Sequence, residues 1–367
     1  MINVFHIVSN KIWSGPEQYA FDLACMLKDD PGYYVEIVCR KSDSVFSKFR
    51  TLEVPVSMLP LKGFHDFESP VRFSRLLKRG HNIIHVHSFR DAVVAIWAKH
   101  IAENPKNRIV FTLHGVPHPR LNYVSKKVYR EVDRVIFVSQ KAYNEFIPRI
   151  QRFDSDKAVI IRDSVLPATN EQMQGAPDLR RICQMTDEQA MIMFHGRLSH
   201  EKGIDLLLQA LSRMDGSKYH LVVIGEGQRK FVSQIKGFIV SHNMVKNVTF
   251  LGFSGNVQPL IKQCRFGVLP SIMPEALGLS NLEYMMQGKA HITTNNGAQP
   301  EYINNGENGL LVNPGSEEEL ATAIHTLLSD SVLCSRLGMQ AQRDFNERLN
   351  YQNFYQEMTK LYSGLYQ

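Results

Sequence analysis

Short runs of apolar, mostly β-branched residues alternate with stretches of helical periodicity along the whole chain. Several runs are apolar at successive positions, which is typical of strands that helices cover on both faces. The repeated strand–helix order predicts an α/β fold with doubly wound parallel sheets. The predicted strands are residues 2–9, 33–40, 82–88, 108–114 and 134–139 in the first half, and 191–198, 219–227, 248–253, 266–271 and 290–295 in the second.

The alternation runs through the chain twice, and a polar stretch separates the two series. Residues 166–181, LPATNEQMQGAPDLRR, contain Pro and Gly and have weak periodicity, so we interpret them as a linker. The sequence predicts two Rossmann-like domains that face a cleft, at residues 1–168 and 169–349. A C-terminal helix at about 350–367 is expected to pack back on the first domain. Ligands are expected at the carboxyl ends of the strands.

Cysteine spacing and hydropathy narrow the class of protein. The five cysteines are scattered and form no CxxC pair, which argues against a disulfide framework and a zinc site and favours a reducing compartment. The start, MINVFHIVSN, lacks the features of a signal peptide, and no run of 18 apolar residues occurs. We therefore expect a cytoplasmic protein, with peripheral attachment to the inner face of the cell membrane as an option.

The positive charge is concentrated in the first half. Residues 1–165 hold 25 Lys and Arg against 17 Asp and Glu, a balance of 25 − 17 = +8, whereas residues 166–367 hold 17 against 19, a balance of −2. This favours an anionic partner, such as a membrane surface or a phosphorylated acceptor, over nucleic acid, although an ordinary solvated surface fits equally well. Residues 69–80, SPVRFSRLLKRG, predict a basic amphipathic helix that either lies on a membrane or packs its apolar face inward.

The segment PEALGLSNLE (274–283) carries the clearest chemistry. It follows an apolar strand, and a helix is predicted to begin near Gly278 and to stop before Gly288. The free N–H groups of the first turn suit a phosphate. Glu275 precedes this helix and Glu283 lies inside it, so each carboxylate is placed to accept hydroxyls at a different end of a sugar nucleotide. A capping Glu and a solvent-exposed Glu are the plainer alternative.

Other strand ends add to this segment. In HGRLSHEKG (195–203), Arg197 and Lys202 stand at a strand–helix junction, where cations can hold a diphosphate and neutralise a leaving group. GEG (225–227), FLGF (250–253) and NNGAQPEYINNGENGLLV (295–312) also follow strands or turns. Taken together, these segments resemble the retaining GT-B glycosyltransferases of family 4, and the resemblance is strongest from about 191 to 328.

The resemblance implies roles for particular residues. Arg197 and Lys202 would bind the donor diphosphate, Glu275 would face the donor sugar and Glu283 would bind the ribose. The other donor-binding positions are Gly196, Gly225, Phe253 near the base, and the N–H groups of Leu277, Gly278 and Leu279.

The first half matches the family more loosely. The family has a Gly-Gly loop after its first strand, whereas this chain has Gly15 followed by Pro16, which offers no N–H to a phosphate. Gly15 therefore remains the candidate for the phosphate contact in this loop. His114, in FTLHG, stands where the family has a His near the donor sugar and the acceptor. As catalytic residues we expect Arg197, Lys202, Glu275 and His114.

The resemblance implies transfer of a sugar, a hexose or N-acetylhexosamine, from a nucleotide diphosphate sugar to a glycan or lipid-linked acceptor. UDP is favoured over GDP, neither a cofactor nor a metal is required, and cell-surface polysaccharide assembly is the expected context. Asp154-Ser155-Asp156 has the spelling of a metal-binding pair, but it lies in a polar stretch and we interpret it as a solvated loop.

Three other classes of protein share parts of this pattern. A dehydrogenase is disfavoured because GEG lacks the later Gly of GxGxxG. A GT-B-fold nucleotide-sugar epimerase and a non-catalytic sugar-nucleotide-binding subunit remain alternatives, and the Gly15-Pro16 departure favours the second of these.

Overall fold

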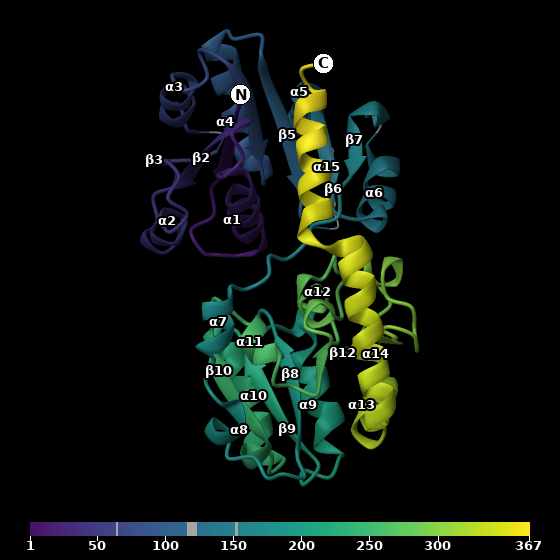
Figure 1. Ribbon diagram of the computed structural model, residues 1–367. Helices are drawn as coiled ribbons and strands as arrows, with labels where there is room; N and C mark the ends of the chain where they lie inside the picture. Colours follow the sequence, from purple (N-terminus) through teal and green to yellow (C-terminus); the bar gives the residue numbers. More distant parts are fainter. Residues whose placement is uncertain (64, 116–122, 151–152) are drawn as a thin grey trace. The chain divides into compact units, whose positions relative to one another are not determined.

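A computed structural model describes residues 1–63, 65–115, 123–150 and 153–367 (Figure 1). The chain divides into two compact units, one of Met1–Asp163 together with Tyr351–Gln367, and one of Ser164–Asn350. Each unit is built on one parallel sheet with helices on both faces. The predicted α/β fold with two doubly wound domains is therefore confirmed.

The first unit contains a seven-stranded sheet in the order β3-β2-β1-β4-β5-β6-β7, and every neighbouring pair is parallel. The chain starts at β1 in the middle, extends to one edge, and then returns to β4 on the other side of β1. The strands are β1 (Ile2–Val8), β2 (Tyr33–Arg40), β3 (Val56–Leu59), β4 (His81–Val86), β5 (Asn107–Leu113), β6 (Arg134–Phe137) and β7 (Ala158–Ile160).

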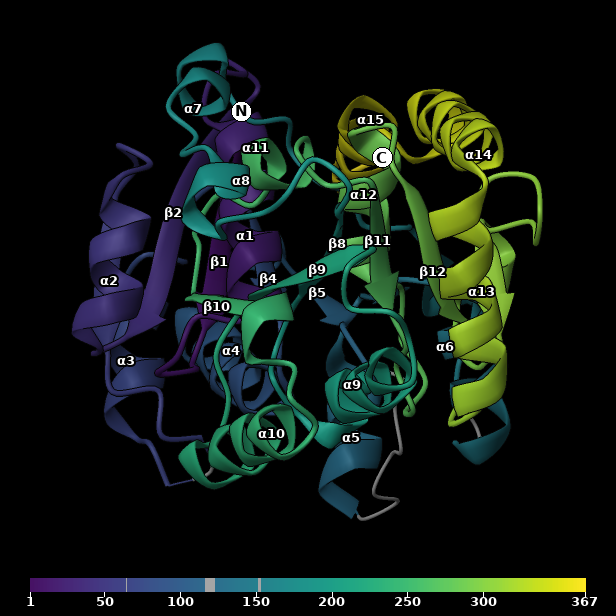
Figure 2. The same ribbon diagram turned by 90° about the horizontal axis from the view of Figure 1, so that it is seen from below.

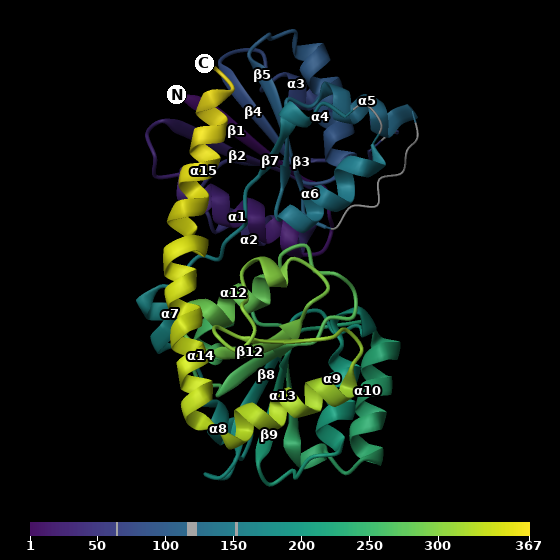
Figure 3. The same cartoon turned by 90° about the vertical axis from the view of Figure 1, so that its right-hand side faces the viewer.

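Helices cover both faces of this first sheet, as Figure 3 shows for α15 on one side and α3, α4 and α5 on the other. The residues of β1 alternate between two cores: Phe5 and Ile7 belong to one, Val4 and Val8 to the other. The helices are α1 (Gly15–Leu27), α2 (Asp43–Arg50), α3 (Glu68–Ser74), α4 (Phe89–Ala102), α5 (Tyr123–Glu131), α6 (Gln140–Phe146) and the C-terminal α15 (Tyr351–Gly364).

The second unit has a six-stranded parallel sheet in the order β10-β9-β8-β11-β12-β13. Its strands are β8 (Ala190–His195), β9 (Tyr219–Ile224), β10 (Val248–Gly252), β11 (Phe266–Leu269), β12 (Ala290–Thr294) and β13 (Leu310–Val312). Its helices are α7 (Asn170–Gln174), α8 (Leu179–Ile182), α9 (Ile204–Ser212), α10 (Arg229–Ser241), α11 (Gln258–Ile261), α12 (Leu279–Met286), α13 (Glu317–Ser329) and α14 (Ser331–Asp344).

Burial on both faces explains why the strands of the second unit read as continuous apolar runs. Ile192 and Phe194 of β8 pack into the core formed with α9, α10 and α13, whereas Met191 and Met193 pack into the core formed with α8, α11 and α12. Figure 2 shows α9 and α10 on one side of this sheet and α8, α11 and α12 on the other.

Two local predictions are corrected. Residues 166–181 are not an open linker: they belong to the second unit and contain α7 and the start of α8. The Gln258 side chain holds this segment, because its amide donates to Leu166 O and its Oε1 accepts from Ala168 N. Only Ser164 and Val165 of the second unit precede this stretch, and the chain leaves the first unit at Asp163.

The basic helix predicted at 69–80 is shorter than expected. The α-helix α3 ends at Ser74, and the buried carboxylate of Asp66 organises its start by accepting from the N–H and the hydroxyl of Ser69. Ser69 therefore lies in the first turn of the helix, and Phe67 is the N-cap. Phe73 and Leu77 are buried as expected, but Leu76 is exposed.

Candidate active site

The candidate site of the second unit lies where the strand order reverses. β8 is the first strand of its sheet, and its neighbours β9 and β11 extend the sheet in opposite directions. The loops that follow β8 and β11 leave the same edge of the sheet at this point, and ligands of open α/β sheets bind at such positions. Lys202 follows β8, and Glu275 follows β11.

Lys202 and Glu275 meet in an ion pair. The Lys202 Nζ lies 2.5 Å from Glu275 Oε1, and the Ser271 hydroxyl donates to the same oxygen. The two side chains keep 25% and 13% of their surface exposed, so the pair is sheltered but accessible. A half-buried ammonium held beside a carboxylate can bind an anion on its open side while the carboxylate accepts hydroxyl groups.

The backbone around Glu275 is held by the loop after β12. Ala298 N donates to Glu275 O at 3.0 Å. Gly297 allows this approach, because a Cβ at that position would lie 2.4 Å from Glu275 O and 2.5 Å from its N. The glycine of the first NNG, residues 295–297, thus allows the loop after β12 to contact the loop after β11 that carries Glu275.

The helix α12 begins and ends where the sequence predicts. Gly278 is its N-cap, with φ +88°, and the helix covers Leu279–Met286 before Gly288 takes φ +65°. The Tyr302 hydroxyl donates to Leu277 O at 2.5 Å, which fixes the turn before the helix. The N–H groups of this turn are those that the family resemblance assigns to sugar and phosphate.

Glu283 has a partner that the sequence analysis did not identify. Its Oε2 lies 2.6 Å from Nε2 of His195, and His195 Nδ1 lies 2.8 Å from the Tyr284 hydroxyl. His195 is the last residue of β8, and Ser280 Oγ donates to its carbonyl. The sequence signal that could have identified His195 is its position: it is a polar residue at the end of a buried strand, directly before Gly196.

Backbone packing accounts for the glycines after β8 and β9. Gly196 has φ +146° and Gly225 has φ +138°, and a Cβ on Gly225 would lie 1.9 Å from Gly196 O. The two loops therefore lie against each other, and this close approach requires glycine whatever ligand binds. Phe253, just after β10, keeps 59% of its surface exposed, and its place near the base stays a prediction.

Arg197 is placed differently from Lys202. Its guanidinium pairs with Glu201 at 2.5 Å, and both side chains are more than half exposed. The structure brings Lys202 and Glu275 together, whereas Arg197 pairs with Glu201, so its role at the diphosphate stays a prediction.

The first unit holds the two remaining candidates, Gly15 and His114. Pro16 occupies the first turn of α1, where a missing N–H costs nothing, and the Ser14 hydroxyl donates to Glu17 Oε2. Gly15 itself is exposed, and a Cβ there would meet nothing within 4 Å. His114 follows β5, and its Nε2 lies 3.0 Å from Nδ1 of His87.

The Asp154 and Asp156 side chains are exposed, and Asp154 caps a short turn by accepting from Asp156 N. Within the described ranges, the residues close enough to share a metal ion are instead three buried histidines, His6, His85 and His87.

None of the described helices is both long and apolar enough to cross a membrane.

Comparison with known proteins identifies the family. The family model of glycosyl transferases group 1 matches residues 177–344, and that of glycosyltransferase family 4 matches residues 13–165. The chain is 26% identical over 299 residues to the uncharacterized glycosyltransferase MJ1607 of Methanocaldococcus jannaschii, covering 77% of this chain and 75% of that one. It is 24% identical over 271 residues to the lipopolysaccharide core biosynthesis mannosyltransferase LpcC of Rhizobium leguminosarum bv. viciae, covering 72% and 73%.

Solved structures agree on the fold. The Anabaena protein HepE, crystallised with UDP, superposes with a TM-score of 0.84 at 20% identity over 99% of this chain and 100% of that chain. A glycosyltransferase of Rickettsia africae ESF-5 gives 0.85 at 19% identity over 100% and 98%. The protein is therefore a GT-B glycosyltransferase of family 4.

Proposed function

We propose that the protein is a retaining transferase that moves a hexose or N-acetylhexosamine from a UDP-sugar to a glycan or lipid-linked acceptor in cell-surface polysaccharide assembly. The observation that carries the proposal is the Lys202–Glu275 pair at the reversal point of the second sheet. HepE was crystallised with UDP and glucose, which supports UDP over GDP. LpcC acts in lipopolysaccharide core biosynthesis, which supports a cell-surface acceptor.

The chemistry follows from these groups. The bond between the sugar and the diphosphate breaks through a transition state with positive charge on the sugar and negative charge on the leaving oxygens. Lys202, Arg197 and the N–H groups before α12 supply fixed positive charge for the leaving diphosphate. Glu275 orients the sugar by accepting its hydroxyls. The acceptor oxygen forms the new bond to the anomeric carbon on the same face that the diphosphate leaves, and the departing phosphate takes the acceptor proton. No metal is assigned a step in this scheme.

A nucleotide panel tests the donor. We expect UDP and a UDP-sugar to raise the melting temperature more than GDP and a GDP-sugar, because a ligand that binds only the folded state stabilises it. Slow release of UDP without acceptor, unchanged by EDTA, should accompany binding. GDP binding alone would contradict the choice of nucleotide, release that needs manganese would contradict the metal-free scheme, and binding without release under any acceptor would identify a non-catalytic subunit.

We further propose that the first unit contacts an anionic membrane surface through its α3 region. Phe67 keeps 70% of its surface exposed, and its ring lies 5.6 Å from that of Trp97, which is also exposed. Four exposed cations of the α3 region lie between Phe67 and Trp97 in the sequence, and one of them, Arg72, pairs with Glu68: Arg72, Arg75, Lys78 and Arg79. Aromatic side chains beside cations are typical of surfaces that enter the headgroup region.

Vesicle flotation tests this surface. The protein should float with phosphatidylglycerol-containing vesicles at low salt and be released at high salt, because the attraction is screened. Phe67→Ser should reduce flotation, whereas Val240→Ser, which changes an exposed apolar residue of the second unit, should not. Absence of flotation at low salt would refute the proposed surface and leave the transferase assignment intact.

A further inference from the structure

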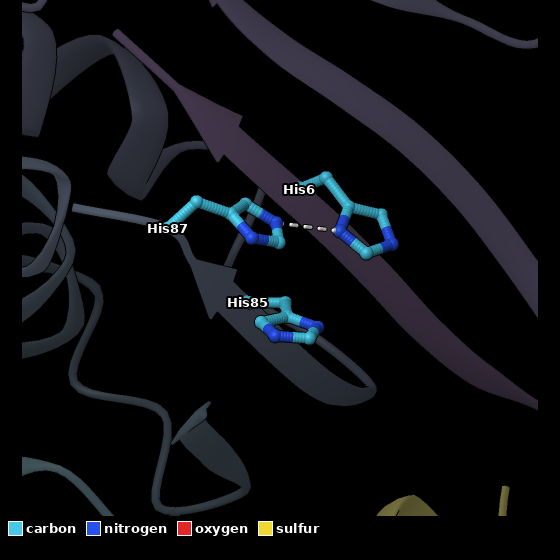
Figure 4. A group of neighbouring side chains, drawn as sticks. All are labelled: His6, His85 and His87. Carbon is cyan, nitrogen blue, oxygen red and sulfur yellow. Dashed lines mark hydrogen bonds between the residues drawn. The ribbon is translucent and has the colours of Figure 1, made fainter. Parts of the chain in front are cut away.

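Three buried histidines of the first unit lie at the reversal point of its sheet, behind His114. β1 and β4 are neighbours there, and β1 carries His6 while β4 and its end carry His85 and His87. Figure 4 shows the rings of His6 and His87 pointing toward each other, with His85 beside them. His6 and His85 have no exposed surface, and His87 keeps 5%.

The rings form a chain that ends at His114. Nδ1 of His6 lies 3.1 Å from Nε2 of His87, and Nδ1 of His87 lies 3.0 Å from Nε2 of His114. Burial lowers the pKa of His6 to about 3 and that of His114 to about 3, and it holds the pKa of His87 well below its usual range. All three rings are therefore neutral near pH 7, and each carries one hydrogen.

One hydrogen per ring allows only two arrangements. Since His87 uses both nitrogens, it donates in one bond and accepts in the other, so the chain must point as a whole either toward His114 or toward His6. His114 cannot change its tautomer unless the other two rings change with it. The Nε2 of His114 is hydrogen-bonded to His87, so Nδ1 is the nitrogen that can form a hydrogen bond with a substrate oxygen.

The buried end of the chain selects the direction. His6 Nε2 is buried and has no hydrogen-bond partner among the described residues. With a hydrogen, that nitrogen would be a buried donor without an acceptor; without one, it is only an unpaired acceptor, and unpaired buried N–H groups are the rarer of the two in proteins. The hydrogen of His6 is thus assigned to Nδ1, so that every bond of the chain donates toward His114.

We propose that His6 and His87 are positioning residues that hold His114 as its Nδ1–H tautomer, so that His114 donates a hydrogen bond to a sugar hydroxyl of the substrate. The second half of this statement rests on the proposed transferase function. The first half, the tautomer, is a property of the free protein and is independent of that function.

A metal site is the competing interpretation of the same cluster. It requires one free nitrogen from each ring. The His85 nitrogens are already engaged, with Nδ1 2.6 Å from the Tyr362 hydroxyl and Nε2 2.7 Å from Thr112 Oγ1. Both nitrogens of His87 are in the chain. An ion would have to break several buried hydrogen bonds, so the geometry favours the hydrogen-bonded chain.

The test is a long-range 1H–15N correlation spectrum of the full-length, 15N-histidine-labelled protein, with the His114 signals assigned by their loss in His114→Asn. In the wild type we expect His114 to show the cross-peak pattern of a ring protonated at Nδ1, the Nδ1–H pattern. In water a neutral histidine favours Nε2–H, so His87→Phe, which removes the partner of Nε2, should return His114 mainly to the Nε2–H pattern. Transferase kcat should fall about 10- to 100-fold, since a misplaced group costs this much, while the melting-temperature shift with UDP stays unchanged.

His85→Phe is the matched control. It alters a buried histidine of β4, two residues before His87, which packs against His87 with ring centroids 4.5 Å apart but is not in the chain. It should lower the melting temperature and leave the His114 spectrum unchanged.

An Nε2–H pattern in wild-type His114, a pattern that His87→Phe does not change, or zinc-dependent shifts of His6, His85 and His87 would each overturn the proposal. The wild-type spectrum decides even if His87→Phe fails to fold. A wild-type protein with the expected spectrum but no transferase activity would count against the proposed function alone.

Discussion

Replacing Lys202 with Met should lower kcat about 100- to 1000-fold, the size of effect seen when one preorganised group facing developing charge is removed. Lys202 is the sheltered cation of the second unit's candidate site, and it lies 2.5 Å from Glu275 Oε1. Its charge is needed most when the diphosphate leaves, so kcat should fall more than donor affinity. Initial-rate kinetics with donor and acceptor varied separately would measure this.

Glu275→Gln should reduce kcat to a similar degree, because the amide keeps the shape of the side chain but loses the charge that holds Lys202. The matched control is Lys218→Met, which breaks an exposed pair with Glu188 at 3.5 Å and should change neither kcat nor melting temperature. Near-normal turnover in both Lys202→Met and Glu275→Gln, with melting temperatures close to that of the wild type, would refute the site.

Gly203→Ala should destabilise the second unit by several kcal/mol and abolish activity as well. Gly203 takes φ +71°, a conformation that costs about 1–2 kcal/mol for a residue with a side chain. A Cβ there would also lie 2.0 Å from Pro270 O, so the β11 loop would have to move. Pro270 precedes Ser271, whose hydroxyl bonds Glu275, and displacement of this loop would separate Lys202 from its partner.

Gly237→Ala provides the control for this prediction. Gly237 lies on the exposed side of α10, and an added Cβ would meet nothing within 4 Å. Alanine should therefore stabilise the helix by about 1 kcal/mol. Thermal unfolding followed by circular dichroism compares the two variants. An unchanged melting temperature in Gly203→Ala would show that the two loops do not have the close contact described here.

The local pattern was sufficient for most strands because their burial on both faces leaves long apolar runs. The three strands that were not predicted, β3, β7 and β13, are short edge strands, in which only three or four residues carry the signal. The helix at 69–80 was predicted too long because the periodic positions Phe73, Leu76 and Leu77 do not reveal where the hydrogen-bonded turns stop. Asp66, which organises the start of α3, lies outside the periodic segment.

The candidate site, too, could be predicted only in part from the sequence. The spacing of Glu275 and Glu283 around a predicted helix start identified the segment, and the start of α12 lies where the spacing placed it. The sequence did not show that Glu283 pairs with His195, 88 positions away, or that Glu275 pairs with Lys202, 73 positions away. Gly196 and Gly225 were recognisable as glycines at strand ends, but the backbone contact between them, and the one that requires Gly203, were not.

By itself the sequence determined the α/β class, the two sheets and the segments that carry charge at strand ends, because periodicity and turn residues act over a few neighbouring positions. The tertiary structure alone decided which of those charges meet and joined His6, His87 and His114 in one chain. Strand order sets these partners: β8 lies beside β11, and β1 beside β4, although each pair is separated in sequence by two other strands. Contacts between distant segments depend on that order, which no local pattern encodes.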